Sequence, residues 1–134
     1  MKAVFDTNVL IAAFLTEGIC AKLLIRARRR DFDLILCDGI LQEFKRILKK
    51  KFATSPYETS EALIILSEAA LEIHGLTDSI TPICRDSDDD FILACAKDAV
   101  ADYVVTGDED LLVLKNYEGT RIVNPREFEK LFPD

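Results

Sequence analysis

Carboxylates that directly follow apolar segments are the part of this sequence best able to do chemistry. Asp6 comes after Ala-Val-Phe and Asp108 comes after Tyr-Val-Val-Thr-Gly, and both runs have the composition of short buried strands. Because the carboxyl ends of parallel strands meet at one edge of a sheet, we expect the two acids to converge there. Several carboxylates in one small pocket need a counter-charge to remain ionised, and a divalent metal ion supplies it. The pattern therefore predicts a metal-dependent hydrolase.

Further acids lie beside apolar helical segments. Glu43 lies on the flank of an apolar stripe with helical spacing, and Asp90 lies in the first turn of a segment rich in small and apolar residues. Asp110 follows Asp108 by two residues, and Gly107 before them allows a tight turn close to a ligand. Each acid alone has a simpler explanation, such as helix capping or solvation of the surface. We expect the combination, rather than any single acid, to mark the site.

The elements that must position these acids alternate along the chain. Alternating strands and helices predict an α/β fold, a parallel sheet with helices on both faces and the first strand at its centre. Pro82 confines the third strand to an edge of the sheet, because proline cannot donate to a neighbouring strand. Asp38 is expected as the N-cap of the helix that carries Glu43. We expect a single domain over residues 1–134. The expected strands are 2–5, 32–37, 79–83, 102–106 and 120–123. Two of the expected helices begin at residues 7 and 38, and the others are 20–30, 56–75, 88–100, 108–114 and 125–131.

Composition narrows the classes of function. The 134 residues are 49% hydrophobic and 31% charged, which indicates one globular domain. No charged segment precedes an apolar signal core, and no run approaches the roughly 18 apolar residues of a membrane span. We therefore expect a cytoplasmic protein without membrane contact. The four cysteines form no Cys-x-x-Cys pair and His74 is the only histidine, which disfavours zinc and histidine-based sites.

The charge distribution allows two interpretations. The formal net charge is −7, from 17 basic and 24 acidic residues, which by itself argues against a polyanionic partner. The basic residues concentrate, however, in the segments 26–30 and 45–51. They could hold a nucleic-acid backbone beside an acidic metal pocket, or they could solvate helix faces and complement helix C-termini. Both interpretations stay open on these grounds.

Four segments, in a particular order and spacing, cover nearly the whole chain: 4–10 (VFDTNVL), 41–44 (LQEF), 85–90 (RDSDDD) with 93–96 (LACA), and 102–112 (DYVVTGDEDLL). Together they resemble the PIN domain family (PilT N-terminus), metal-dependent ribonucleases that include the toxins of type II toxin–antitoxin modules. The pairing of a hydrophobic-Asp-Thr-Asn start with Thr-Gly-Asp-x-Asp-Leu-Leu is specific. The chain departs from the family at Ser87, where proline is usual, and at Phe91, where lysine is frequent. These changes concern a loop and a peripheral contact more than the metal site.

The resemblance implies a fold and a set of site residues. The implied fold is a three-layer α/β/α sandwich whose five-stranded parallel sheet has the order 3-2-1-4-5. Among the acids around residue 90, Asp90 is preferred because it precedes the small-residue helix at the family's spacing. The implied catalytic acids are Asp6, Glu43, Asp90 and Asp108, with Asp110 as a further metal contact and with Thr7, Asn8 and Thr106 as polar residues that hold waters or carboxylates in place.

The implied activity is that of an endoribonuclease dependent on Mg²⁺ or Mn²⁺. Asp6, Asp90 and Asp108, joined by Asp110, would bind metal, and Glu43 would be a ligand or would activate water. Single-stranded or unpaired RNA is the expected substrate. The expected partners are an antitoxin protein, with this chain as the toxin of the pair, and a second copy of the chain in a homodimer.

Other activities fit the sequence less well. A phosphatase of the haloacid dehalogenase type also begins with a strand that ends in Asp, but it needs a second Asp where this chain has Asn8. A phosphorelay receiver would need a phosphoacceptor and lysine arrangement that this sequence lacks. A PIN scaffold that binds RNA or protein with little catalysis remains the alternative to the nuclease.

Overall fold

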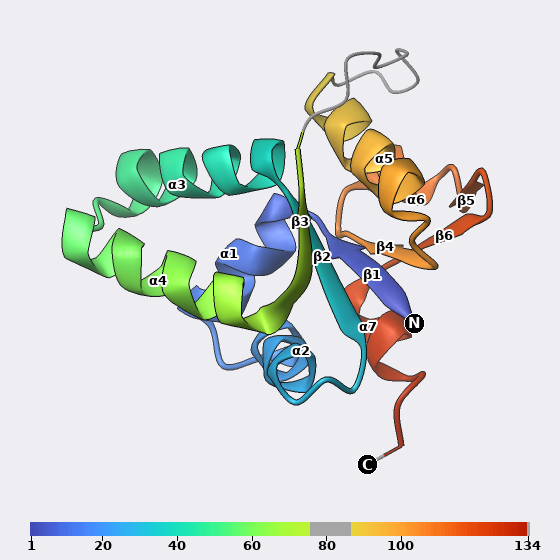
Figure 1. Ribbon diagram of the computed structural model, residues 1–134, viewed down its shortest axis with the longest axis horizontal. Coiled ribbons are helices and arrows are strands. Elements are labelled where there is room, and N and C mark those ends of the chain that lie inside the picture. Colours follow the sequence, from blue (N-terminus) through green and yellow to red (C-terminus); the bar gives the residue numbers. More distant parts are fainter. Residues whose placement is uncertain (76–86, 134) are drawn as a thin grey trace.

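A β-sheet runs through the middle of the molecule, with helices on both sides (Figure 1). The structure is a computed structural model, and it describes residues 1–75 and 87–133. The strands are β1 (Lys2–Phe5), β2 (Asp33–Cys37), β3 (Ala70–His74), β4 (Tyr103–Val105), β5 (Asn116–Tyr117) and β6 (Thr120–Val123). The helices are α1 (Thr7–Leu15), α2 (Ile19–Arg28), α3 (Asp38–Phe52), α4 (Pro56–Ala69), α5 (Ser87–Ala99), α6 (Glu109–Leu112) and α7 (Pro125–Glu129).

The sheet has the order β3-β2-β1-β4-β6-β5. All neighbours from β3 to β6 pair in parallel, so the expected order of five parallel strands, with the first strand inside the sheet, is confirmed. The expectation of a purely parallel sheet is wrong, because β5 pairs antiparallel with β6. The turn between them holds Glu118 and Gly119 at φ 48° and 89°. Two successive left-handed residues are the geometry of a tight hairpin, and Gly119 adopts it without strain.

The third strand lies earlier in the sequence than expected. The helix expected over 56–75 ends at Ala69, and the chain passes directly into β3, so His74 lies in a strand. Leu71 and Ile73 are exposed while the residues between and after them are half-buried, which is the alternation of a strand. The apolar run before Leu71 suits either structure, and pairing with β2 decides in favour of the strand. The strand expected at 79–83, with Pro82, lies outside the described residues.

Side chains cap the first turns of α4, α6 and α7, whereas α3 begins without a side-chain cap. The N-cap of α3 is Cys37, not Asp38; Asp38 is the first helical residue, where its charge favours the helix dipole. At α4, Ser55 and Glu58 form a capping box, and α7 begins in the same way. The other expected elements are confirmed within about two residues, the usual uncertainty of a helix or strand end. Among the described residues no single helix is long and apolar enough to cross a membrane; by length and composition only the pair α1 and α2 could, and it is bent by 98° at its break.

Two layers of helices enclose the sheet, as the three-layer prediction requires. In Figure 1, α1 to α4 lie on one side of the strands and α5 and α6 lie on the other. α5 packs across β1, β2 and β4. On the opposite face, Phe128 of α7 packs against Phe5 and Phe32, with ring centroids 6.0 and 5.0 Å apart. Parallel backbone pairing places β4 beside β1, and the predicted acids Asp6 and Asp108 follow these two strands.

Candidate active site

The ends of β1 and β4 bring two of the predicted site segments together. Asp6 directly follows β1 and is the N-cap residue of α1. Its backbone N–H donates to the carbonyl of Val105, the last residue of β4, at 3.0 Å. The hydroxyl of Thr106 donates to Asp6 Oδ2 at 2.7 Å, and the two residues are only 0% and 5% exposed. Main-chain pairing therefore places the Asp6 carboxylate against the residue after β4.

Hydrogen bonds continue from Thr106 to the acids that follow it. The backbone N–H of Asp108 donates to Thr106 Oγ1 at 3.0 Å, and the N–H of Asp110 donates to Asp108 Oδ1 at 2.9 Å. Asp108 is half-buried and is the N-cap residue of α6. Gly107 is exposed and has no positive φ, and an added Cβ would meet nothing within 4 Å, so the turn itself does not require glycine. The structure thus joins four of the predicted residues: Asp6, Thr106, Asp108 and Asp110.

Burial makes the ionised form of Asp6 costly. Desolvation is the main cause that raises the pKa of Asp6 above its ordinary value, and the charge of Asp108 acts in the same direction. The Thr106 hydroxyl and the backbone amides of Thr7 and Asn8 oppose this rise in pKa without cancelling it. The side chain of Thr7 is buried and that of Asn8 is exposed. The backbone of these two residues, at the start of α1, therefore contributes to the environment of the carboxylate.

Glu43 and Asp90 reach the same end of the sheet from two helices. α3 starts directly after β2, at the carboxyl end of a strand parallel to β1, and the first turn of α5 lies at this end too (Figure 1). Glu43 is half-buried, as predicted for the flank of an apolar stripe, and its Oε2 lies 3.8 Å from Nη2 of Arg46. Asp90 is 4% exposed. A carboxylate is seldom buried so deeply without a partner, so the burial of Asp90 is consistent with the metal-binding role predicted for it.

The close carboxylates of this edge form a pair rather than a larger cluster. Within 1–75 and 87–133, no three Asp, Glu, His or Cys side chains converge as a group able to hold a metal ion. The charge of Asp108 acts on the Asp6 carboxylate. Mg²⁺ is commonly held by one or two carboxylates together with waters and substrate phosphates, so the pair fits such an ion. The wider ligand set, with Asp90 and Asp110, stays a prediction.

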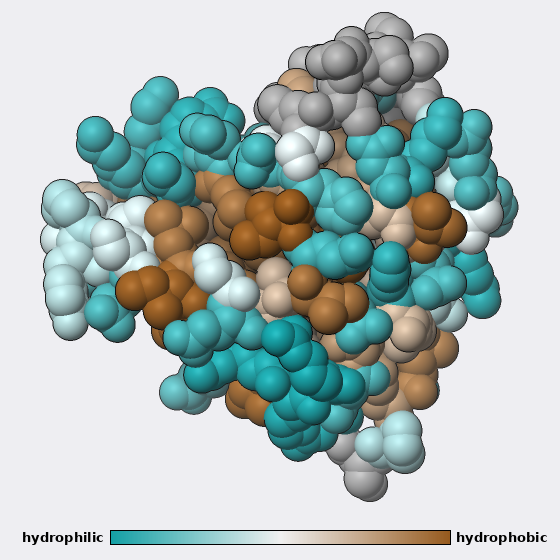
Figure 2. Space-filling model, viewed as in Figure 1, coloured by the Kyte–Doolittle hydropathy of each residue, from teal (hydrophilic) through white to brown (hydrophobic). Residues whose placement is uncertain are grey.

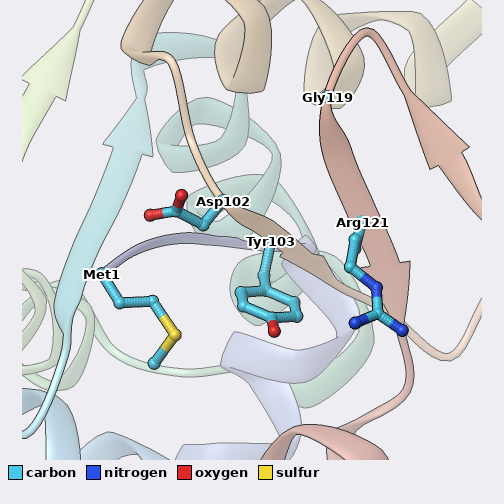
Figure 3. A pocket seen from close by; sticks show the side chains of 5 residues that line it. All are labelled: Met1, Asp102, Tyr103, Gly119 and Arg121. Atoms are coloured by element: carbon cyan, nitrogen blue, oxygen red, sulfur yellow. The ribbon is translucent and has the colours of Figure 1, made fainter.

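A second concave feature lies at the other end of the strands. It is an open hollow of about 450 Å³, lined by side chains from the amino ends of β1, β4 and β6 (Figure 3). It contains one carboxylate, that of Asp102, whose Oδ2 accepts the backbone N–H of Lys2 at 2.9 Å. Asp6 and Asp108 follow the opposite ends of the same strands. The hollow is therefore separate from the predicted site.

Two contacts of the site did not follow from the sequence analysis. The bond from Asp6 to the Val105 carbonyl depends on strand pairing across about 100 positions, and no local pattern signals it. Arg46 beside Glu43 could have been found, because residues three apart face each other on a helix.

Comparison with known proteins gives the same fold and a family. Residues 2–110 match the PIN domain family. VapBC2 from Rickettsia felis, bound to a DNA fragment from its promoter, contains a chain with TM-score 0.66 and 15% identity, covering 92% of this chain and 98% of that one. A similar chain occurs in FitAB bound to an IR36 DNA fragment, with TM-score 0.61 and 15% identity, covering 92% of this chain and 94% of that one. Another occurs in FitAcB from Neisseria gonorrhoeae, with TM-score 0.60 and 16% identity, covering 92% of this chain and 98% of that one. No curated protein sequence matches significantly. Because the family match covers most of its length, the chain belongs to the PIN domain family.

Proposed function

We propose that this chain is an endoribonuclease dependent on Mg²⁺ or Mn²⁺, acting at the edge where Asp6, Thr106 and Asp108 meet. The observation that carries the proposal is the buried Asp6 carboxylate, whose pKa is raised by desolvation while a second carboxylate, Asp108, stands nearby. Such a pair opposes folding unless a cation joins it, and a protein keeps such an arrangement where the cation is used. A PIN domain with this pair intact fits a nuclease better than a degenerate scaffold.

The proposed roles of the site residues are metal binding, positioning of a carboxylate and orientation of water. Asp6 and Asp108 would hold the ion, with Asp90 and Asp110 as further ligands. When bound, the ion would neutralise the carboxylates and stabilise negative charge on the scissile phosphodiester. Thr106 donates to Oδ2 of Asp6 and so would hold the carboxylate in place for the ion. Glu43, half-buried at the same edge, would orient the attacking water or accept its proton.

The partner of this enzyme would be an antitoxin protein. The chain shares its fold with chains of VapBC2 and FitAB over 92% of its length, which supports a place as the toxin of a toxin–antitoxin pair. The antitoxin would cover the acidic edge, and two copies of the chain would form a homodimer. Expression of the chain alone should stop growth, and co-expression of the neighbouring small DNA-binding protein should restore it. Unaffected growth without any antitoxin would count against the toxin assignment.

Cleavage of end-labelled single-stranded RNA tests the enzymatic proposal. The wild-type protein should cut with Mg²⁺ or Mn²⁺ and should not cut in EDTA. The double variant Asp6→Asn, Asp108→Asn should lose at least about a hundredfold in rate, since it lacks both carboxylates of the pair. The matched control Glu61→Gln, Asp98→Asn removes two exposed charges and should keep full activity. Equal cleavage by the wild type and the Asp6, Asp108 variant would refute the nuclease.

The alternative is a PIN scaffold that binds RNA or protein without cutting. Uncleaved RNA that binds equally to the wild type and to the double variant, with either metal, would favour this alternative over the nuclease.

A further inference from the structure

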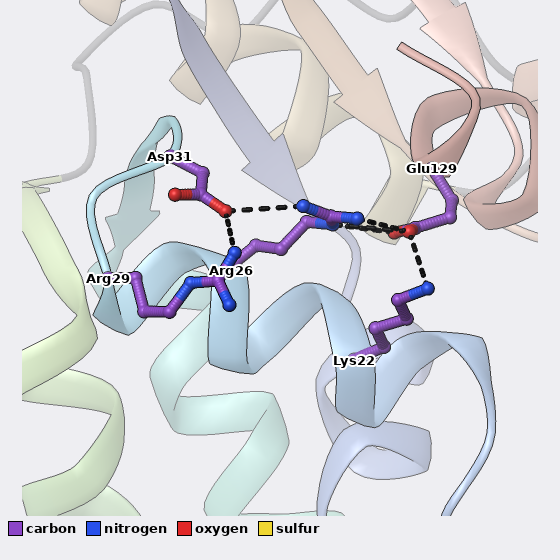
Figure 4. A network of polar contacts seen from close by, with 5 residues as sticks. All are labelled: Lys22, Arg26, Arg29, Asp31 and Glu129. Carbon is purple, nitrogen blue, oxygen red and sulfur yellow. Dashed lines mark hydrogen bonds and ion pairs between the residues drawn. The ribbon is translucent and has the colours of Figure 1, made fainter. Parts of the chain in front are cut away.

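The two basic segments of the chain have different uses in the fold, and the first is used internally. Arg26 is 3% exposed and donates to both carboxylate oxygens of Glu129, at 2.7 to 3.1 Å, and to Asp31 at 3.3 Å (Figure 4). Arg29 donates to Asp31 at 2.6 Å. Arg30 donates to the last two carbonyls of α4. Arg26 and Arg30 join the end of α2 to α7 and α4, and Arg29 pairs with Asp31 in the turn that follows, so all three side chains have partners within the fold.

The second segment forms an exposed row on α3. Its members are Lys45, Arg46, Lys49 and Lys50, and all four are exposed. At about 100° per residue they fall within an arc of ~140° on the side of the helix opposite the buried Phe44. Figure 2 shows a mainly hydrophilic surface over α3. These four residues are called the α3 basic row below.

Helix stability accounts for Lys49 and Lys50, which lie in the last turn of α3, but not for the whole α3 basic row. Cations in the last turn complement the helix dipole, but Lys45 and Arg46 are the eighth and ninth of 15 residues, where that effect has faded. The C-terminal end is closed by the backbone of Ala53, which is left-handed with φ 48°. In the described parts of the chain, the only ion pair or hydrogen bond made by a side chain of the row is that of Arg46, 3.8 Å from Glu43. The row is therefore available to a partner.

We propose that the α3 basic row binds the phosphate backbone of single-stranded RNA as it leaves the acidic edge. This inference rests on RNA being the substrate of the proposed function. The chain carries a net charge of −7 and the cleavage site is itself acidic, so an RNA strand is repelled unless cations lie along its path. Arg46 places the row directly beside Glu43, and Lys45 and Lys49 lie about 6 Å apart along the helix axis. The alternative ligand for the α3 basic row is an acidic segment of a protein.

Salt-dependent RNA binding tests the proposal. Anisotropy of a labelled single-stranded RNA of about 12 nucleotides is measured in EDTA, so that nothing is cut, from about 50 to 400 mM KCl. Poly-glutamate is measured in parallel as an acidic polypeptide. Thermal unfolding is recorded for each protein; all substituted residues are exposed, so the melting temperatures should agree. The row variant is Lys45→Gln, Lys49→Gln, Lys50→Gln, and the control with the same change in net charge is Arg28→Gln, Lys115→Gln, Lys130→Gln.

The two variants should behave differently towards RNA. Each lost phosphate contact lowers the slope of log K against log salt by about 0.7, so the row variant should lose about 2 in slope and about a hundredfold in affinity at 0.1 M salt. The control variant should change affinity less than about threefold, since only the general field alters. Equal losses in both variants would overturn the proposal. So would unchanged RNA binding with loss of poly-glutamate binding, which would assign the row to an acidic protein.

The RNA-binding role of the α3 basic row and the nuclease activity can be refuted independently of each other. With Mg²⁺, the row variant should show a raised KM and an unchanged kcat, because the acids of the cleavage site are intact. An unchanged KM would overturn the row and leave the nuclease standing. Wild-type protein that binds RNA through the row but does not cut it would overturn the nuclease alone.

Discussion

Replacing Asp6 by Asn should stabilise the metal-free protein while abolishing cleavage. In the folded state the pKa of Asp6 is raised above the ordinary value of 3.8, chiefly by desolvation. A raised pKa means that the carboxyl contributes stability below about pH 3.8 and loses it as the pH rises through the folded pKa, so the penalty is complete at pH 7. Asn carries no charge and still offers an oxygen to the hydroxyl of Thr106. The advantage of the variant should therefore appear at neutral pH and disappear in acid.

The change in stability caused by Asp6→Asn combines the removal of a buried charge, which stabilises, with a weaker hydrogen bond from Thr106, which destabilises. Each tenfold change in the ionisation equilibrium corresponds to about 1.4 kcal/mol. The hydrogen bond from the Thr106 hydroxyl joins two neutral groups in the Asp6→Asn variant, so it is weaker there by about 1 kcal/mol. The net rise in the pKa of Asp6 already includes the opposing effect of this hydrogen bond. For a chain of this size, each 1 kcal/mol of stabilisation corresponds to a rise in Tm of about 3–5 °C, so the direction of the change can be read from the melting temperature. Metal reverses the ranking, because an ion at 100 times its Kd stabilises the wild type by about 2.7 kcal/mol.

Thermal unfolding of both proteins, in EDTA and with Mg²⁺ or Mn²⁺ at pH 7, measures this reversal. The variant should melt higher in EDTA, and the wild type should melt higher with metal. Asp98→Asn is the matched control, because it removes an exposed carboxylate and should follow the wild type in both conditions. A wild type that melts above Asp6→Asn in EDTA would refute the reasoning about burial. Equal metal-induced shifts in both would refute Asp6 as a ligand.

Three further changes test single contacts. Thr106→Val should lower stability by about 1–3 kcal/mol, by removing the donor to Asp6, and should move the acid limb of the cleavage pH profile upward, whereas Thr106→Ser should keep both properties. Arg26→Ala should cost about 3 kcal/mol in urea unfolding, because it leaves the Glu129 carboxylate, which is only 16% exposed, with Lys22 as its described ionic partner. The pKa of Glu129 is held below its ordinary 4.5 mainly by Arg26 and to a smaller extent by Lys22, so this stabilisation is present above pH 4.5 and is lost as the pH falls through the folded pKa; the variant should show a smaller acid transition. Gly107→Ala should leave Tm within about 1 °C, since the new Cβ meets nothing, and should weaken RNA binding by crowding the open surface beside the acids.

The position of the central acids of the site, Asp6 and Asp108, could be predicted because it depends on where two strands end. Asp6 and Asp108 each follow a run of apolar residues, and parallel strands bring such ends to one edge. The contact of Thr106 with Asp6 is consistent with the supporting role predicted for Thr106. The order of the five parallel strands also agrees with the resemblance that the sequence carries. What was local, or followed directly from the topology, was predictable.

Features that depend on competition between local patterns were not predictable. Residues 70–74 continue an apolar helix pattern and also alternate like a strand, and only the presence of β2 beside them selects the strand. At α3, Cys37 and Asp38 are both adjacent to the first turn, and strand β2 extends through Cys37, so the acid falls inside the helix. The position of Glu43 and Asp90 relative to the pair at β1 and β4 depends on how two helices pack, which sequence spacing alone does not determine.

The two basic segments show why net charge is a poor guide to a partner. The segment 26–30 contains four arginines and the segment 45–51 contains four lysines and one arginine, and in the sequence they look equivalent. In the fold, Arg26 meets Glu129 from 103 positions away and Arg30 meets carbonyls 38 and 39 positions away, and these acceptors cannot be seen in any local window. On α3, the only acceptor that the described residues offer to the side opposite Phe44 is Glu43, 3.8 Å from Arg46, so the lysines of this side remain available to a ligand. A chain of net charge −7 can therefore still attract a polyanion, because the uncommitted cations, rather than the total, determine the local potential.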